Sequence, residues 1–414
     1  RLRNVYRPDN KIGRTLKGAL STAPKVLLTA TPLQNSLMEI YGLVSLIDDY
    51  AFGDAKSFRS QYTRLSGDAL FNELKGRLSP VCHRTLRRQV LEYIRYTTRI
   101  PITQEFVPTE DEQALYDMVS EYLRRPSLQA LPSSQRTLMT LIMRKLLASS
   151  TFAIAGALDS LSRKLERQLK DDRDLREKLE EEISQDFEEF EEIADEWSDD
   201  VDEPELLTEE DIAVIEREIK DLRDFRDLAE TISENAKGQS LLSALRAGFD
   251  KAAELGGPKK TIIFTESRRT QEYLLRLLSE NGYDGQLVLF NGSNSDPMSR
   301  DIYNAWIERH KGTDRVTGSR TADMRAAIVD YFREQASIMI ATEAAAEGIN
   351  LQFCSMVVNY DLPWNPQRIE QRIGRCHRYG QKFDVVVVNF LNKNNAADHD
   401  RRRRAKALRQ PGHG

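Results

Sequence analysis

Apolar residues follow two different patterns in the first part of the chain. A short apolar run at 26–28 precedes a polar loop and the segment 37–48, where apolar residues recur every three or four positions. This order predicts a buried strand, a loop and a helix, and Ser36 with Glu39 three residues later forms a capping-box signature. From 58 to about 165 the helical period continues. We therefore expect a mainly helical region of long amphipathic helices there.

Beyond Gly256 the pattern changes to short apolar runs that alternate with helical periods. Such alternation predicts βαβ units and a parallel sheet covered by helices on both faces. Four polar loops, "TES", "NGS", "ATEAAAEG" and "YDLPWNP", each follow a predicted strand. Ligands of open α/β sheets bind beyond the carboxyl ends of the strands, so these loops predict a site at one edge.

Composition and charge narrow the class of protein. The chain is 40% hydrophobic and 30% charged, which indicates a soluble protein with one strongly polar helical part. No Lys or Arg occurs from Leu179 to Glu216, which favours a solvated helix face or connector over an acidic binding tail. A net charge of -5 does not exclude a nucleic-acid partner, because binding depends on local basic surfaces. The dispersed Cys and His residues give no metal-ligand spacing, and no apolar run reaches membrane-spanning length.

A row of arginines marks the strongest candidate chemistry. Arg368, Arg372 and Arg375 are spaced four and three apart on a predicted helix, and Arg378 is expected to continue the row. Arginine makes planar, bidentate contacts with phosphate, and one placed at a γ-phosphate accelerates phosphoryl transfer. The alternative is an exposed basic helix end that interacts with the helix dipole.

Two glycine-containing segments invite comparison with phosphate-binding loops. The loop around Gly348 has small residues that allow close backbone approach, although a tight connection without a ligand has the same composition. The segment 256–261, "GGPKKT", does not match G-x-x-x-x-G-K-[ST], since Thr261 opens a strand. The sequence also lacks an Asp-Glu pair followed two positions later by His or Asp. We therefore expect the main nucleotide-gripping groups to lie outside this sequence.

Taken together, four segments resemble the helicase motifs of Swi/Snf-family ATPases, a branch of helicase superfamily two, and most closely prokaryotic members. They are "VLLTATPLQNS" (third motif), "KTIIFTES" (fourth), "IATEAAAEGINL" (fifth) and "EQRIGRCHRYGQ" (sixth). The resemblance implies two RecA-like lobes that bind ATP with Mg²⁺ between them and move along double-stranded DNA. The Mg²⁺ ligands are not expected in this chain. "EAAAE" at 343–347 departs from the Arg-Ala-Gly-Gly-Leu of many relatives.

The resemblance also implies roles for individual residues. Arg375 and Arg378 correspond to the catalytic arginine fingers. Expected nucleotide-binding residues are Gln371, Gly348, Glu347 and Asn350. Residues expected to couple the lobes are Thr29, Ala30 and Thr31, and those expected to touch the backbone of DNA are Thr265, Ser267 and Thr342.

The predicted fold class is α/β: a RecA-like parallel-sheet lobe covered by helices, preceded by a long helical insertion and a remnant of the first RecA-like lobe. The expected domains are 1–57 (end of the first lobe), 58–238 (helical protrusion with acidic helices), 239–392 (second lobe) and 393–414 (disordered basic tail). The first residues resemble the segment after a D-E-x-H box. The tail indicates either an incomplete or frame-shifted chain or a basic segment that binds nucleic acid.

Three functional hypotheses follow. The first is the carboxyl-terminal portion of an ATP-dependent, DNA-stimulated helicase or translocase, inactive on its own. The second is a catalytically inactive nucleic-acid-binding module, and the third is an interaction protein whose acidic helices recruit a protein partner. We expect a cytoplasmic, nucleoid-associated protein without a membrane partner.

Overall fold

The computed structural model describes residues 11–29, 37–48, 50–62, 68–83, 85, 89, 93, 96–131, 136–169, 209–232, 235–343, 348–363 and 365–393. The chain divides into two compact units, Arg1–Arg95 and Tyr96–Gly414, which are described separately.

The first unit consists of short helices with a small core. Its elements are α1 (Lys11–Ala19), α2 (Leu37–Ile47), α3 (Ala55–Tyr62) and α4 (Asp68–Leu78). The helix predicted at 37–48 is confirmed as α2, whereas Ser36 of the capping box lies outside the described residues. The strand predicted at 26–28 is wrong: Val26 and Leu28 are 84% and 93% exposed. No strand in the described part of this unit pairs with the run, so it has no sheet in which to be buried.

The second unit contains a single parallel sheet, which confirms the predicted α/β class. Its strands are β1 (Arg99–Phe106), β2 (Thr261–Thr265), β3 (Leu287–Phe290), β4 (Ile338–Thr342), β5 (Met356–Asn359) and β6 (Val385–Asn392). The strand order is β1-β6-β5-β2-β4-β3, and every pair is parallel. β2, β3, β4 and β5 are buried at every position, as expected for strands covered on both faces.

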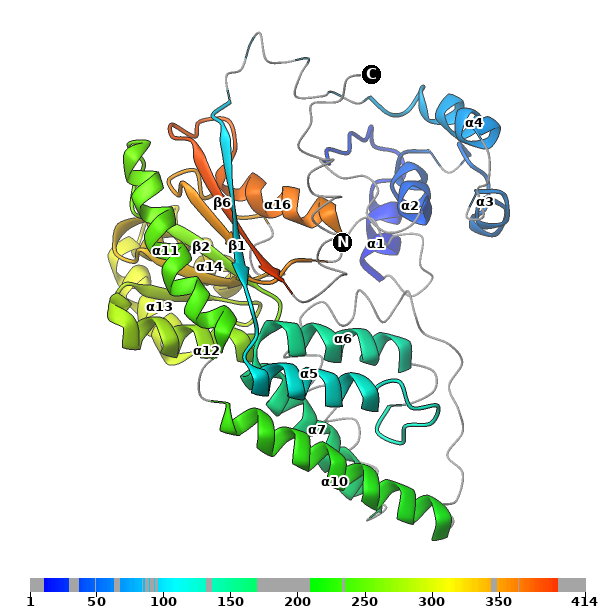
Figure 1. Ribbon diagram of the computed structural model, residues 1–414. Helices are drawn as coiled ribbons and strands as arrows, with labels where there is room; N and C mark the ends of the chain where they lie inside the picture. Colours follow the sequence, from blue (N-terminus) through cyan, green and yellow to red (C-terminus); the bar gives the residue numbers. More distant parts are fainter. Residues whose placement is uncertain are drawn as a thin grey trace. The chain divides into compact units, whose positions relative to one another are not determined.

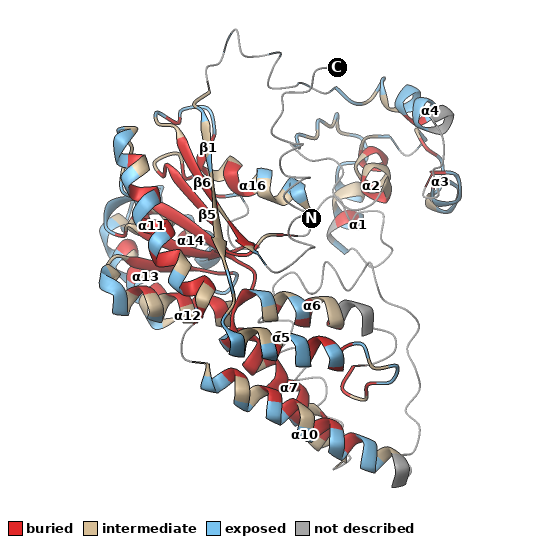
Figure 2. Cartoon of the chain, viewed as in Figure 1, coloured by how far each residue is buried: buried red, intermediate tan, exposed pale blue. Residues whose placement is uncertain are grey.

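Helices cover both faces of this sheet (Figure 1). They are α11 (Ala236–Glu254), α12 (Arg268–Leu278), α13 (Pro297–His310), α14 (Arg320–Glu334) and α16 (Pro366–Cys376). Alternate strand residues point to opposite faces, so Ile263 packs with the α11 and α12 side chains while Ile262 and Phe264 pack with those of α13, α14 and α16. Apart from β1, the strands are accordingly mostly buried, and the helices are exposed on their outer surfaces (Figure 2).

One strand was not predicted from the sequence. β1 lies within the stretch read as mainly helical, and it pairs with β6 from Arg99↔Val385 to Phe106↔Asn392. It is one of the two edge strands of the sheet, and most of its residues are only half-buried. Pro101 interrupts the apolar pattern, but an edge strand tolerates proline because one side of it needs no ladder donors. The sheet therefore includes a segment from well before the second-lobe motifs.

Four helices form a separate apolar core, called here the helical bundle: α5 (Glu110–Tyr122), α6 (Arg136–Ser149), α7 (Thr151–Leu169) and α10 (Glu209–Thr231). α5, α6 and α7 confirm the amphipathic helices predicted from the periodicity between 58 and about 165, and α7 and α10 lie side by side (Figure 1). α5 begins with a capping box between Thr109 and Glu112. Glu218 of α10 is buried and accepts hydrogen bonds from the Tyr122 hydroxyl at 2.7 Å and the Gln129 backbone N–H at 2.8 Å. None of the described helices is long and apolar enough to span a membrane.

Candidate functional site

The carboxyl ends of the parallel strands bring the predicted loops to one edge of the sheet. Glu266 and Ser267 follow β2, Asn291 follows β3, Glu343 follows β4, and Asp361 lies two residues beyond β5. Because all strands run in the same direction, these residues lie at the same edge. The convergence that the sequence predicted is therefore present in the structure.

Asp361 lies at the centre of a buried polar network at this edge. Its Oδ1 accepts from Lys237 Nζ at 2.8 Å, and its Oδ2 accepts from the hydroxyls of Thr265 at 2.7 Å and Ser149 at 2.8 Å. The backbone N–H of Glu266 also donates to Oδ2, at 3.1 Å. A buried carboxylate with a cation and three further donors is satisfied as an ion.

The ionisation of Asp361 follows from these partners. Burial by itself raises the pKa of a carboxyl group, but the Lys237 charge and the hydrogen bonds from Lys237, Thr265 and Ser149 outweigh it. The pKa of Asp361 is therefore held below its ordinary value, and the group is charged at neutral pH.

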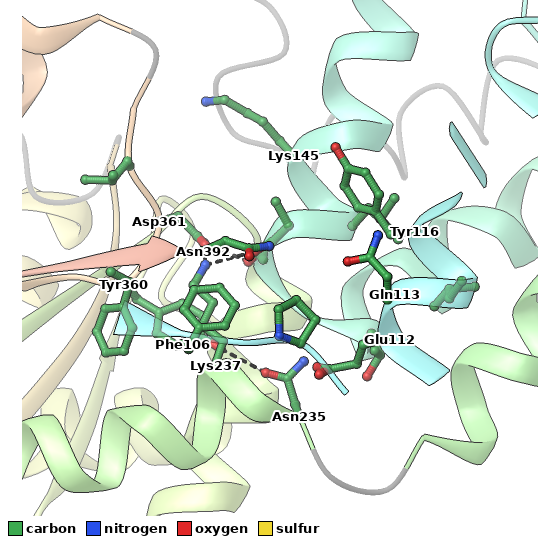
Figure 3. Close-up of a pocket in the computed structure, with 18 of the residues that line it drawn as sticks. Phe106, Glu112, Gln113, Tyr116, Lys145, Asn235, Lys237, Tyr360, Asp361 and Asn392 are labelled. Atoms are coloured by element: carbon green, nitrogen blue, oxygen red, sulfur yellow. Dashed lines mark hydrogen bonds and ion pairs between the residues drawn. The ribbon is translucent and has the colours of Figure 1, made fainter. Parts of the chain in front are cut away.

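Lys237, near the start of α11, has further partners besides Asp361. Its Nζ donates to the Ala148 carbonyl of α6 at 3.0 Å and lies 4.2 Å from the centroid of the Tyr360 ring. A cavity of about 160 Å³ adjoins this cluster (Figure 3). Its lining comes from the ends of β1 and β6, the loop after β5 and the helices α5 and α6, including Phe106, Tyr116 and Asn392.

A second buried charge, Arg372, holds the arginine-bearing helix α16 against the sheet. Its side chain is 1% exposed, and its Nε donates to Glu343, the residue after β4. Its Nη1 donates to the Asp361 backbone carbonyl at 2.5 Å, and the guanidinium lies 5.1 Å from the centroid of the Phe264 ring. Arg372 therefore joins the sixth-motif helix α16 to Glu343 of the fifth-motif segment through a buried contact.

The carboxyl end of α16 is fixed by different contacts. His377 caps the helix, its backbone N–H donates to Ile373, and its ring contacts the Thr97 carbonyl at 2.5 Å and the Arg99 Nε at 2.9 Å. Gln381 Nε2 donates to the carbonyls of Cys354 at 3.0 Å and Cys376 at 3.1 Å. The segment that carries the predicted fingers is thus tied both to β1 and to the loop before β5.

The predicted row of arginines requires a correction. α16 ends at Cys376, so Arg378 lies beyond the helix in a turn and does not continue the helical row. Arg372 is buried, Arg375 is half-buried and Arg378 is exposed. Burial increases towards the middle of the helix because Arg372 faces Glu343 and the strand ends. Of the four predicted arginines, Arg372 is therefore structural, Arg368 and Arg375 are half-buried, and Arg378 is exposed.

The other predicted nucleotide-binding residues lie at positions of different exposure. Gly348 and Asn350 are exposed, and Gly348 has φ +83°, a backbone conformation that favours glycine. Gln371 is half-buried, and its Nε2 has no hydrogen-bond partner among the described residues. Glu347 lies outside the described residues, as do Ala30 and Thr31 of the coupling motif, whereas Thr29 is described and exposed. These roles stay predictions.

The three residues expected to touch DNA are fully buried in this structure. The Thr265 hydroxyl donates to Asp361, and the Ser267 hydroxyl caps α12 by accepting from the N–H groups of Arg269 and Thr270. Thr342 is also fully buried at the end of β4. Their contact with DNA stays a prediction, and the structure gives Thr265 and Ser267 an internal role.

Sequence reasoning did not identify Asp361, Lys237 or the burial of Arg372 as parts of the site. The available signal was an aspartate directly after the apolar run "MVVNY", in a loop already expected at the site edge. Lys237 carries no such signal, because its partner Asp361 is 124 positions away.

The described residues contain no group of three or more His, Cys, Asp or Glu that could hold a metal ion. Cys354 and Cys376 are buried, and burial is the main cause that raises the pKa of the Cys376 thiol.

Comparisons with known proteins agree with the helicase motifs identified in the sequence. Residues 3–153 match the SNF2-related domain, and residues 243–380 match the helicase conserved C-terminal domain. The uncharacterized ATP-dependent helicase YqhH of Bacillus subtilis is 30% identical over 377 residues, which cover 90% of this chain and 51% of that protein. The RNA polymerase-associated protein RapA of Vibrio cholerae is 44% identical over 71 residues, 16% of this chain and 7% of that protein. The chain thus spans about half the length of YqhH.

Two solved structures were also similar. The C-terminal part of the Fun30 ATPase domain is 15% identical with a TM-score of 0.40, covering 75% of this chain and 90% of that one. The Sulfolobus solfataricus SWI2/SNF2 ATPase core in complex with dsDNA is 16% identical with a TM-score of 0.36, covering 94% of this chain and 62% of that one. At these TM-scores the fold assignment rests on the strand order of the chain itself. The chain carries an SNF2-related domain and a helicase conserved C-terminal domain, and its resemblance to the Swi/Snf family of helicase superfamily two is thereby confirmed.

Proposed function

We propose that the chain is the carboxyl-terminal portion of an ATP-dependent, DNA-stimulated Swi/Snf-like translocase, with Arg375 and Arg378 as its arginine fingers. One observation carries the proposal: α16 is anchored through buried Arg372, whereas Arg375 and Arg378 lie nearer the surface around its carboxyl end. A helix carboxyl end also interacts favourably with cations. The arrangement presents two guanidinium groups from a rigid support.

The chemistry follows from where charge develops. During phosphoryl transfer, negative charge spreads over the equatorial oxygens of the γ-phosphate, and positioned arginines stabilise that charge. Donors that are already in place cost no reorganisation at the moment of reaction. The contacts of Arg372 and His377 hold the segment on both sides of Arg375, and so supply this preorganisation.

The proposed DNA partner is the sugar-phosphate backbone of a duplex, bound without sequence preference. Support comes from the family match and from the name of one similar structure, a SWI2/SNF2 core in complex with dsDNA. The exposed arginines Arg315 and Arg333 lie with Gly348 and Asn350 around one open hollow beside the fifth motif. We propose this face as a place where the phosphate backbone is attracted.

A second candidate function is a nucleic-acid-binding module that hydrolyses nothing. It is favoured by the sequence itself, which contains neither G-x-x-x-x-G-K-[ST] nor an Asp-Glu pair with the spacing of a D-E-x-H box. The two candidates differ in turnover and agree on DNA binding.

The test is steady-state ATP hydrolysis by the full-length gene product, with and without double-stranded DNA, beside the same assay on these 414 residues. We expect DNA-stimulated turnover by the gene product, and a loss of about 10³-fold in kcat for Arg375→Ala. The KM for ATP should change much less, since the finger acts on charge that is present mainly in the transition state.

Lys382→Ala is the matched control, because it removes one exposed positive charge from the turn that follows α16. It should leave kcat unchanged. Turnover that survives Arg375→Ala would show that the fingers are misassigned. No turnover by either protein, with DNA binding that weakens steeply as salt rises, would establish the binding module instead.

A further inference from the structure

Asp361 connects the helical bundle to the arginine-bearing helix through its own atoms. Its carboxylate binds Ser149 at the end of α6 and Lys237 at the start of α11. Its backbone carbonyl accepts the hydrogen bond from Arg372 of α16. The helical bundle therefore contacts the side chain of Asp361, and α16 contacts its backbone carbonyl.

α6 is held to the strand ends by more than this carboxylate. Lys145 forms an ion pair with Glu266 at 2.5 Å, and the Ser149 hydroxyl lies 2.8 Å from the Thr270 hydroxyl. The side chains of Lys145 and Glu266 are 10% and 4% exposed, so this pair is shielded from water. Each displacement of α6 would leave buried polar groups without partners, which costs free energy. The network consequently favours one placement of α6 against the loops after β2 and β5.

The same geometry specifies the position of α16. The loop after β5 cannot shift without moving the Asp361 carbonyl, and that carbonyl binds the guanidinium of Arg372. Arg372 is three residues before Arg375, so the two lie on neighbouring turns of one helix face. A movement at Asp361 is thereby transmitted to the predicted finger.

We propose that Asp361 is a positioning residue, through which the docking of α6 and α11 sets the placement of α16 and of Arg375. The inference rests on the proposed function, in which Arg375 acts on ATP. Asp361 itself touches no substrate in this scheme.

The lobe's folding does not depend on this network alone. Apolar clusters fill both faces of the sheet, and they include most of the buried strand residues. The polar network lies at the edge, where the loops begin. Weakening it is therefore expected to displace α16 before it unfolds the sheet.

The test substitutes Lys237→Met in the full-length gene product, which retains the apolar stem and removes the ammonium group. We expect kcat for DNA-stimulated ATP hydrolysis to fall about 10-fold to 100-fold, the scale of a misplaced catalytic group. The KM for ATP should stay within about twofold, because ground-state binding is not altered. Lys237→Arg, which restores the cation, should recover kcat to within about threefold.

Lys251→Met is the matched control on the same helix, since Lys251 forms an exposed ion pair with Glu254. It should behave like the wild type. If Lys237→Met fails to fold, Ser149→Ala takes its place, because it removes only one hydroxyl from Asp361.

A second readout does not depend on activity. Hydrogen exchange of the α16 backbone amides in the 414-residue chain should be faster in Lys237→Met and in Ser149→Ala, by about fivefold for one lost hydrogen bond. Exchange in α13 and α14 should not change. A folded variant with wild-type kcat and wild-type α16 exchange overturns the proposal. If the wild-type gene product hydrolyses no ATP, the proposed function fails and α16 exchange decides alone: faster exchange supports the positioning role and unchanged exchange overturns it.

Discussion

The replacement of Arg372 by methionine measures how strongly α16 is anchored. Methionine keeps a long apolar side chain against Phe264 but removes the guanidinium. The variant loses the bond from Nε to Glu343, the 2.5 Å bond from Nη1 to the Asp361 carbonyl and the contact of the cation with the Phe264 ring. Glu343, whose side chain is 13% exposed, is left without its cation.

The expected magnitude combines these losses with one gain. Hydrogen bonds to charged groups contribute about 1.5–3 kcal/mol each, and removing one partner of a buried ion pair costs about 3–5 kcal/mol in total. The gain is that the guanidinium no longer has to be desolvated, including its Nη2, which has no partner among the described residues. We therefore expect the free energy of unfolding to fall by about 3 kcal/mol, the lower end of that range.

Urea denaturation of the 414-residue chain, followed by far-UV circular dichroism, provides the measurement. The double variant Arg372→Met with Glu343→Leu should regain most of the loss, because apolar replacement of a whole buried pair is close to neutral. Arg309→Met is the control, since Arg309 pairs with Glu334 while both side chains are about half exposed. Its effect should stay below about 1 kcal/mol. An Arg372→Met variant within about 0.5 kcal/mol of the wild type would refute the anchoring argument.

Two further predictions concern stability and use the same denaturation assay. Because the pKa of Asp361 in the folded protein lies below its ordinary value of 3.8, its contribution to the unfolding free energy is complete above that pH and is lost as the pH falls through the lower folded value. The wild type should thus lose no unfolding free energy from this group between pH 7 and pH 5, and should lose it below about pH 4. This acid loss should be smaller in the double variant Asp361→Asn with Lys237→Met. An equal acid loss in the wild type and the double variant would contradict the prediction. Gly348→Ala should lower the free energy of unfolding by about 1 kcal/mol, because Gly348 has a positive φ. Gly374→Ala should raise it by about 0.4–1 kcal/mol, because Gly374 lies inside α16 and has open space at its Cβ position. Equal effects at both sites would contradict the conformational argument.

The fold was predictable where burial is encoded locally. β2, β3, β4 and β5 are continuous apolar runs because both faces of each strand are covered, so they could be predicted from the sequence. β1 could not, since half-burial and Pro101 weaken its pattern. The run at 26–28 had the composition of a strand, but a strand also requires a partner, which composition does not specify.

Part of the site was predictable as well. Because the strands are parallel, the loops after them meet at one edge of the sheet, and this rule located the edge that holds Glu266, Glu343 and Asp361. The sequence also gave the spacing of the arginines on α16. It did not reveal that Arg372 is buried, because burial depends on Glu343, 29 positions away. Partners at such separations are determined by the packing of whole elements rather than by local periodicity.

The pairing of β1 with β6 has a consequence for how the protein is made. The hydrogen bond between the Thr98 backbone N–H and Asp384, which opens this pairing, joins residues 286 positions apart. On the ribosome, β1 is synthesised long before its only partner strand in the described sheet, and it must wait while the helical bundle and the interior strands appear. Until then the N–H and C=O groups of β1 and the open side of β5 are unpaired edges. The sheet is thus completed only after β6 has been synthesised, and the interval before that is when chaperone protection of this lobe matters most.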